Sequence, residues 1–500
     1  SGSTWIFWGI VTPTLGGLVA GLLLHFVIPA ARGSGIPQVK HIYAAGSGRI
    51  RLRDGVGKFL LASFQIGSGA SLGREGPTVQ ICASVASALG RLFALSPSNQ
   101  RRLLPVGAAA GIAAAFNAPI AAVTFVVEEL VGGLDTTVLS GVVVAAAIAA
   151  AVEHSILGPS PVFSVPGDYA LTSASSLILY AILGIAAAFV GTLFVKLLLF
   201  VRAMFRRASF LPAWIQPAIG GLVTGALAVA VLSTLHTTGV TGGGYETLGK
   251  ALRGNLPFQV LAVLCLVKVL ATVSSYSSGG AGGIFAPSLF IGGMLGGAIG
   301  QFDSTILHHS QTSPGAFALV GMGAVFAAVV RTPITSILII FEMTGSYGLV
   351  LPLMISNTVA FLIARRFSKL PIYEALLDQD GIRLPQAPKN QSSLSRLSVA
   401  QSMTKNPVVI DGEWTIEDTF HRIERLSYAS YPVVDSQGVI LGVLTEARIR
   451  RIMAEDDASR TAGENARTRE YLSQTQSLRD ALGAMHRLGV RQMAVIDAPS

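Results

Sequence analysis

The sequence has little charge for its length. Only 13% of its 500 residues are Asp, Glu, Lys or Arg, roughly half of the ~25% that is usual in soluble proteins. Apolar residues make up 51%, and their runs recur from Trp5 to Ala364, which a single buried core cannot absorb. This pattern excludes a soluble globular protein over that range. It predicts an all-α polytopic membrane domain.

Residues for metal, redox or covalent chemistry are also scarce. The two cysteines, Cys82 and Cys265, lie in apolar segments, and the eight histidines form no pair at ligand spacing. We therefore expect no disulfide framework, no metal and no cofactor. No nucleophile–base pair or phosphate loop appears either, so we do not expect an enzyme.

The basic excess lies in the apolar part of the chain. Residues 1–375 carry 21 Lys and Arg against 11 Asp and Glu, a net +10, whereas residues 376–500 carry 15 against 16, a net −1. Clusters in loops favour positive-inside anchoring in a bilayer. An electropositive route for anions is compatible with the same charges. Nucleic-acid binding is not expected, because no basic stripe falls on a soluble module.

Many apolar segments are shorter than the roughly 20 residues that cross a bilayer, and some of them repeat. Val106–Leu130 matches Val320–Thr344 at 8 of 25 positions, Gly73–Pro77 matches Gly283–Pro287, and Gly33–Gly35 matches Gly242–Gly244. Three blocks in one order predict two homologous halves, about residues 1–155 and 174–366. Halves with an odd number of crossings are inverted in the membrane.

The composition changes near residue 379. Residues 379–398 read as a polar linker, and residues 399–500 alternate β-branched runs with amphipathic helices. We expect strands at 407–410, 431–435, 439–445 and 492–496, and helices near 415–427, 446–456 and 477–488. This is a soluble α/β module.

Five prolines begin apolar segments: Pro37, Pro77, Pro119, Pro287 and Pro333. Proline suits the first helical turn, where free N–H groups and the helix dipole favour an anion. Ordinary helix starts are the alternative, which we favour for one or two of the five.

Glu75 is the most informative residue, because it lies between GSGASL and an apolar helix. A carboxylate there is costly unless something holds it. N–H groups at the helix start could do so, and an anion would compete for them, which would make Glu75 a gate. The alternative is a capping or ion-paired carboxylate, with Arg74 as partner.

Other candidates remain open at this point. Glu128 and Glu129 could be caps or proton carriers. Lys58 and Lys268, each 15 residues before a repeated glycine motif, could form structural ion pairs or act on an anion. Tyr373 could be an interfacial aromatic residue.

The blocks GSGIP (33–37), GREGP (73–77) and GIFAP (283–287) resemble those of the CLC chloride channel and transporter family over about residues 5–378. The 399–500 module resembles the paired CBS domains that follow many CLC membrane domains. The resemblance implies a homodimer with one pore per subunit.

The resemblance also implies roles for single residues. Glu75 would be the gate and outer proton acceptor, and Glu129 the inner proton-transfer residue. The chloride site would be formed by Ser34, Gly35, Ile36, Arg74, Gly76, Ile284, Phe285 and Tyr373, with Ile284 and Phe285 acting through backbone N–H groups. Serine at position 34 suits chloride, whereas members that favour nitrate tend to carry proline.

Two departures from the family are visible. One long and one short helix that normally precede Trp5 are missing, so we expect a trimmed or unusual N-terminus. The second CBS motif lacks its closing strand and helix, which weakens the expectation that the module binds an adenine nucleotide.

These observations predict a chloride/proton antiporter of a bacterial inner membrane, with domain 1–378 in the bilayer and the CBS module in the cytoplasm. A passive chloride channel of the same fold is the first alternative. A CBS-based ligand sensor with vestigial transport is the second.

Overall fold

The computed structural model describes residues 4–44, 48–133, 136–158, 160–163, 165, 169, 176–208, 211–306, 313–384, 394, 397–424, 426, 428–455, 457, 459–466, 471–488 and 492–496. The chain forms two compact units, Ser1–Pro385 and Gln386–Ser500.

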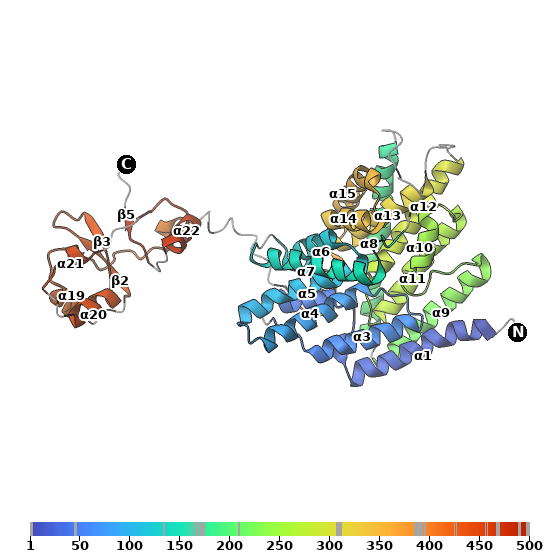
Figure 1. Ribbon diagram of the computed structural model, residues 1–500, viewed down its shortest axis with the longest axis horizontal. Helices are drawn as coiled ribbons and strands as arrows, with labels where there is room; N and C mark the ends of the chain where they lie inside the picture. The colour runs from blue at the N-terminus through green and yellow to red at the C-terminus, as the bar shows by residue number, and fades with distance from the viewer. Residues whose placement is uncertain are drawn as a thin grey trace. The chain divides into compact units, whose positions relative to one another are not determined.

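Helices form the first unit (Figure 1). In chain order they are α1 (Thr4–Phe26), η1 (Pro29–Ala31), α2 (Ile36–Ala44), α3 (Leu52–Gly67), α4 (Glu75–Leu92), α5 (Pro97–Phe116), α6 (Pro119–Phe125), the π-helix η2 (Val126–Val131), α7 (Thr136–Leu157), α8 (Ser176–Arg207), α9 (Gln216–Leu235), α10 (Tyr245–Leu252), α11 (Phe258–Ser277), α12 (Phe285–Ile306), α13 (Pro314–Val330), α14 (Pro333–Thr344), η3 (Tyr347–Leu349), α15 (Val350–Phe367) and α16 (Ile372–Gln379). Within the described residues, seven helical stretches are long and apolar enough to cross a membrane.

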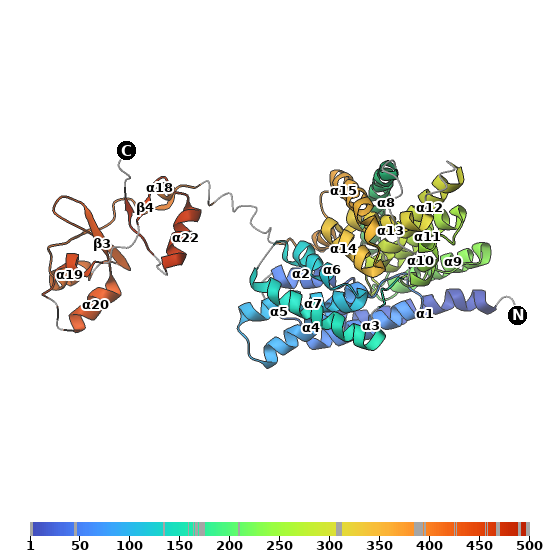
Figure 2. The ribbon, with the colours of Figure 1, turned by 45° about the horizontal axis from the view of Figure 1, so that its top comes forward.

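The two predicted halves are visible as matching helices. By the repeated sequence blocks, α2 corresponds to α10, α4 to α12 and α6 to α14. One matching pair is also in contact, since α6 packs on α14, and the two halves meet again where α1 packs on α9 (Figures 1 and 2). Each of the five prolines lies within the first turn of its helix, as predicted.

Two glutamates show how the halves are related. Glu128 in the first half accepts hydrogen bonds from the N–H groups of Ile334 (3.3 Å) and Thr335 (2.8 Å), which begin α14. Its repeat partner Glu342 accepts from Ile120 (3.0 Å) and Ala121 (2.7 Å), which begin α6. Because each half caps the equivalent helix of the other at equivalent positions, a pseudo-two-fold axis relates them, as inverted repeats require. Glu128 is therefore a cap.

The second unit is a small α/β module. Strands β1 (Ile410–Asp411), β2 (Ser430–Val434) and β3 (Ile440–Thr445) form one sheet, with β1 parallel and β3 antiparallel to β2, and β4 (Leu472–Ser473) pairs in parallel with β5 (Val495–Ile496). The helices are α18 (Val399–Ser402), α19 (Ile416–Ile423), α20 (Glu446–Ala454), α21 (Ala462–Asn465) and α22 (Leu478–Leu488). The strand expected over 407–410 begins only at Ile410, because Val408 and Val409 lie exposed beside a cavity instead of entering the sheet.

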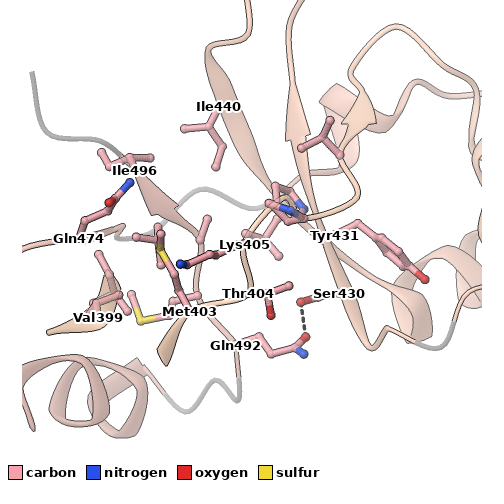
Figure 3. A pocket seen from close by; sticks show the side chains of 18 of the residues that line it. Val399, Met403, Thr404, Lys405, Ser430, Tyr431, Ile440, Gln474, Gln492 and Ile496 are labelled. Carbon is pink, nitrogen blue, oxygen red and sulfur yellow. Dashed lines mark hydrogen bonds between the residues drawn. The ribbon is translucent and has the colours of Figure 1, made fainter. Parts of the chain in front are cut away.

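That cavity, of about 930 Å³, lies within the second unit. Its lining comes from both sheets and from α22, and includes Lys405, Tyr431, Gln474 and Ile496 (Figure 3). A hydrogen bond from Ser430 to Gln492 connects its two sides.

Candidate functional site

The central feature of the first unit is the place where α4 and α12 begin. Gly73 and Gly283, just before these helices, exchange two backbone hydrogen bonds, both of 2.7 Å. The pairing joins GREGP of one half to GIFAP of the other. It fixes the two helix N-termini side by side, so their free N–H groups and dipoles act in the same region.

The loop before α2 closes on the same place. Gly35 has φ +101°, and a Cβ there would lie 2.6 Å from the carbonyl oxygen of Gly76. A Cβ on Gly76 would lie 2.6 Å from the carbonyl oxygen of Ser34. Glycine at both positions therefore lets three chain segments approach to backbone contact.

Glu75 is the first residue of α4 and is buried. Its Oε1 accepts a hydrogen bond of 2.5 Å from the hydroxyl of Tyr245, the first residue of α10. Its Oε2 has no partner within the described residues and lies over Gly73, where a side chain would collide with it. One oxygen is thus anchored and the other faces the junction of the helix N-termini.

Two hydroxyl groups are available for an anion. Ser34 and Tyr373 are fully buried, and neither Ser34 Oγ nor the Tyr373 hydroxyl has a hydrogen-bond partner in the part of the chain that the structure describes. Ser34 precedes α2, and Tyr373 lies in α16, which packs on α2. Buried hydroxyls left without partners are costly, and an anion would satisfy both.

The remaining predicted chloride ligands differ in position. Ile36 and Ile284 are fully buried at the starts of α2 and α12. The Phe285 ring packs against Phe116 (4.8 Å) and Phe326 (4.3 Å), so only its backbone remains for a ligand.

Arg74 is exposed, and its guanidinium lies 5.9 Å from the centre of the Tyr245 ring. It lies outside the buried site.

Glu129 belongs to a buried charge cluster. Its Oε1 is 2.8 Å from Nζ of Lys40 in α2, and the same Nζ is 3.0 Å from Oε1 of Glu374 in α16. Burial decreases outward, because the exposed side-chain fractions are 3% for Glu129, 11% for Lys40 and 37% for Glu374. One ammonium therefore holds two carboxylates.

Lys58 and Lys268 form no ion pair within the described residues, although an ion pair was one of the two alternatives from the sequence. Both side chains are fully buried. Lys58 Nζ donates to the carbonyls of Ala31 (2.8 Å) and Gly33, and Lys268 Nζ to those of Gly239 (3.0 Å), Val240 (3.0 Å) and Gly242 (2.7 Å). Each ammonium fixes the glycine loop before α2 or α10. The structural ion pair, one of the two alternatives from the sequence, does not form here because backbone carbonyls satisfy the charge.

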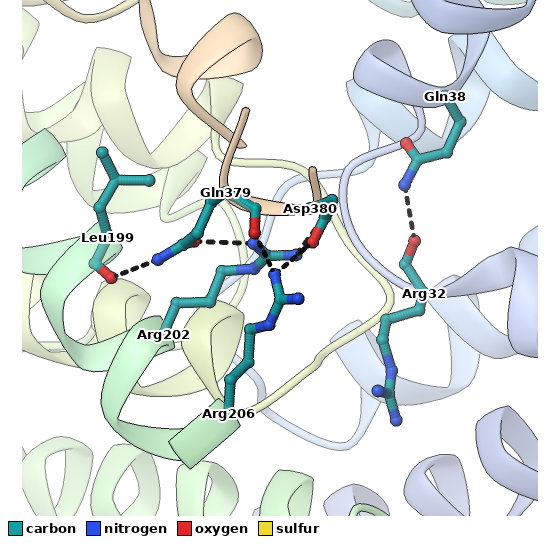
Figure 4. A network of polar contacts seen from close by, with 7 residues as sticks. All are labelled: Arg32, Gln38, Leu199, Arg202, Arg206, Gln379 and Asp380. Carbon is teal, nitrogen blue, oxygen red and sulfur yellow. Dashed lines mark hydrogen bonds and ion pairs between the residues drawn. The ribbon is translucent and has the colours of Figure 1, made fainter. Parts of the chain in front are cut away.

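An arginine cluster fixes α16 against α8 (Figure 4). Asp380 accepts from Arg202 (2.8 Å) and Arg206 (2.6 Å) near the end of α8, and Arg202 also donates to Gln379 (2.7 Å). The contact holds the C-terminal end of α16, and so the helix that carries Tyr373.

Three residues of the site were missed from the sequence: Tyr245, Lys40 and Glu374. Tyr245 had a usable signal, because it directly follows Gly242–Gly244, the repeat of the loop that carries Ser34. Lys40 and Glu374 are separated by 334 residues, and no local pattern connects them.

The comparisons with known proteins identify the family of each unit. The voltage gated chloride channel family matches residues 16–365, and the CBS domain matches residues 398–455. A ClcB-like chloride channel protein of Ralstonia nicotianae is 36% identical over 385 residues, 76% of this chain and 88% of that protein. The H⁺/Cl⁻ exchange transporter ClcA of Vibrio parahaemolyticus is 36% identical over 384 residues, 74% of this chain and 80% of that protein.

Solved structures are similar as well. A slow cyanobacterial Cl⁻/H⁺ antiporter superimposes with TM-score 0.68 and 30% identity over 77% of this chain and 88% of that one. A eukaryotic CLC transporter has TM-score 0.62 and 20% identity over 98% and 86%, which supports the fold alone. The chain therefore belongs to the voltage gated chloride channel family, the CLC family of multi-pass membrane proteins, and carries a CBS domain after its membrane unit.

Proposed function

We propose that this protein exchanges chloride for protons across a membrane, with Glu75 as gate and outer proton acceptor and Glu129 as inner proton-transfer residue. The observation that carries the proposal is a second buried carboxylate beside the middle of α2. The loop before α2 contacts Gly76, next to Glu75. Lys40, four residues after Ile36 and so ~6 Å along the axis, holds Glu129.

The mechanism follows from competition for one site. Ionised Glu75 occupies the outer anion position, where Tyr245 holds one carboxylate oxygen and the other oxygen faces the helix N-termini. Protonation removes its charge, so chloride takes the position. Chloride then moves to the position where the hydroxyl groups of Ser34 and Tyr373 donate hydrogen bonds to it. The proton leaves Glu75 toward Glu129 when the carboxylate returns.

The test uses purified protein in liposomes. A chloride gradient should drive protons uphill in the parent. Glu75→Gln should abolish proton movement and alter chloride flux, and Glu129→Gln should stop protons while chloride continues. Glu246→Gln is the matched control, because Glu246 follows Tyr245 but is exposed and forms its ion pair with Lys250 on the surface. Chloride flux without protons in the parent would refute antiport.

A passive chloride channel is the second candidate, favoured by the name of the Ralstonia relative. It uses Glu75 only as a gate and leaves Glu129 without a transport role. The same liposome experiment separates the two, because a channel carries chloride down its gradient and moves no protons.

Further proposals concern assembly and the CBS module. We infer a homodimer in a bacterial inner membrane, with the module in the cytoplasm. Ile120 and Ile334, at equivalent positions of α6 and α14, are 55% and 56% exposed and offer a symmetric apolar face. The mass of the protein in mild detergent tests the dimer.

The cavity of the module is large enough for an adenine nucleotide. Calorimetric titration with ATP tests this ligand. A nucleotide-binding protein that gives no chloride flux in liposomes would instead be the ligand sensor.

A further inference from the structure

If Glu129 carries protons, it needs a route by which protons reach it from water. Its side chain is only 3% exposed, so it does not exchange protons with water directly. The group through which it does so must lie nearer the surface and contact its cluster. Glu374 meets both conditions, since it is 37% exposed and shares Lys40 with Glu129.

The charges of the cluster suit proton transfer. A lone buried pair of Lys40 and Glu129 would leave an uncompensated ammonium whenever Glu129 took a proton, which is strongly unfavourable. With Glu374 present, the ammonium keeps one ionised partner whichever carboxylate is protonated. A proton can therefore reside on either side without an unpaired buried charge.

Other charged groups near the cluster form hydrogen bonds or ion pairs elsewhere. Glu128, next to Glu129, caps α14. Arg331, which interacts electrostatically with Glu374, donates to the carbonyls of Ser368 and Lys369. At the other end of α16, Asp380 is held by two arginines. Among the described residues, Glu374 is thus the partly exposed acid in contact with the cluster.

We propose that Glu374 takes up protons from the inner solution and passes them to Glu129 through the ammonium of Lys40, which contacts both carboxylates. A proton binds a Glu374 carboxylate oxygen. Lys40 Nζ then gives one N–H proton to Glu129 Oε1 and receives the proton of Glu374. The Lys40 ammonium is restored, and the net result is the transfer of one proton from Glu374 to Glu129 without oxidation or reduction. This proposal rests on the antiport proposed above.

The test compares Glu374→Gln with Asp378→Asn in liposomes under a chloride gradient. Asp378 is an exposed acid four residues further along α16, so its variant removes the same charge from the same helix. Glu374→Gln should lower proton turnover about 10-fold or more, lower the proton-to-chloride ratio, and leave chloride flux. Glu374→Asp should restore most proton turnover, and Asp378→Asn should match the parent.

The outcomes separate the two proposals. If the parent pumps protons and Glu374→Gln pumps them equally well, the relay is wrong and antiport stands. A parent that moves no protons overturns both. Should Glu374→Gln not fold, Glu374→Ser makes the same measurement, because truncation at a half-exposed position leaves no buried cavity. Equal proton loss in Asp378→Asn would assign the effect to surface charge and overturn the relay.

Discussion

Replacing Tyr245 by Phe should destabilise the position of the Glu75 carboxylate in which it excludes chloride. The change removes the hydroxyl that donates to Glu75 Oε1 at 2.5 Å and keeps the ring. The contacts of that ring with Arg74 and Phe163 are therefore retained. A hydrogen bond to a charged group contributes about 1.5–3 kcal/mol, which corresponds to about 10- to 150-fold in an equilibrium.

The bond stabilises the arrangement in which the carboxylate excludes chloride. Chloride should therefore bind Tyr245→Phe more tightly in alkaline buffer, by about 10-fold or more by the same arithmetic. Isothermal titration calorimetry on detergent-solubilised protein measures the dissociation constant. Tyr180→Phe is the control, because Tyr180 is also buried but stacks on Phe317.

A double-mutant cycle makes the test sharper. In Glu75→Gln the ionised competitor is absent, so adding Tyr245→Phe should change chloride affinity little. Unchanged affinity in the single variant, or an equal gain in both backgrounds, would refute the reasoning that Tyr245 acts through the gate.

Three other predictions follow from named contacts. Glu128→Gln and Glu342→Gln should each lower the free energy of unfolding by about 1–2 kcal/mol through lost helix capping, with similar shifts in thermal melting; a large difference would contradict the pseudo-two-fold relation. Lys58→Met should lower stability by about 2 kcal/mol or more, because buried carbonyls lose their donor, and should weaken chloride binding measured by calorimetry. Lys268→Met should lower stability by a similar amount but affect chloride binding less, because the loop that Lys268 holds, Gly242–Gly244, has no serine equivalent to Ser34. Ser34→Pro should raise nitrate transport relative to chloride in a liposome flux assay, and an unchanged ratio would argue against Ser34 as a ligand.

Much of the architecture was predictable because it depends on local sequence patterns. Short apolar segments, prolines in first turns and the repeated blocks predicted the helices and two inverted halves. They also placed Glu75 at a helix start. These features depend on neighbours in sequence, which a single chain displays.

The partners of the buried charges were not predictable in the same way. Glu75 pairs with Tyr245, 170 residues away, and Lys40 with Glu374, 334 residues away. Lys58 donates to backbone carbonyls, whereas a carboxylate partner was one of two alternatives left open by the sequence. A sequence tells that a buried charge needs compensation, but backbone and side-chain groups can both supply it, and only packing decides which.

The ratio of protons to chloride transported by Glu129→Gln in liposomes tests the central claim most directly. The parent should couple the two ions, with protons driven uphill by a chloride gradient. Glu129→Gln should keep chloride flux and lose proton movement. Undiminished proton pumping by Glu129→Gln would contradict the account.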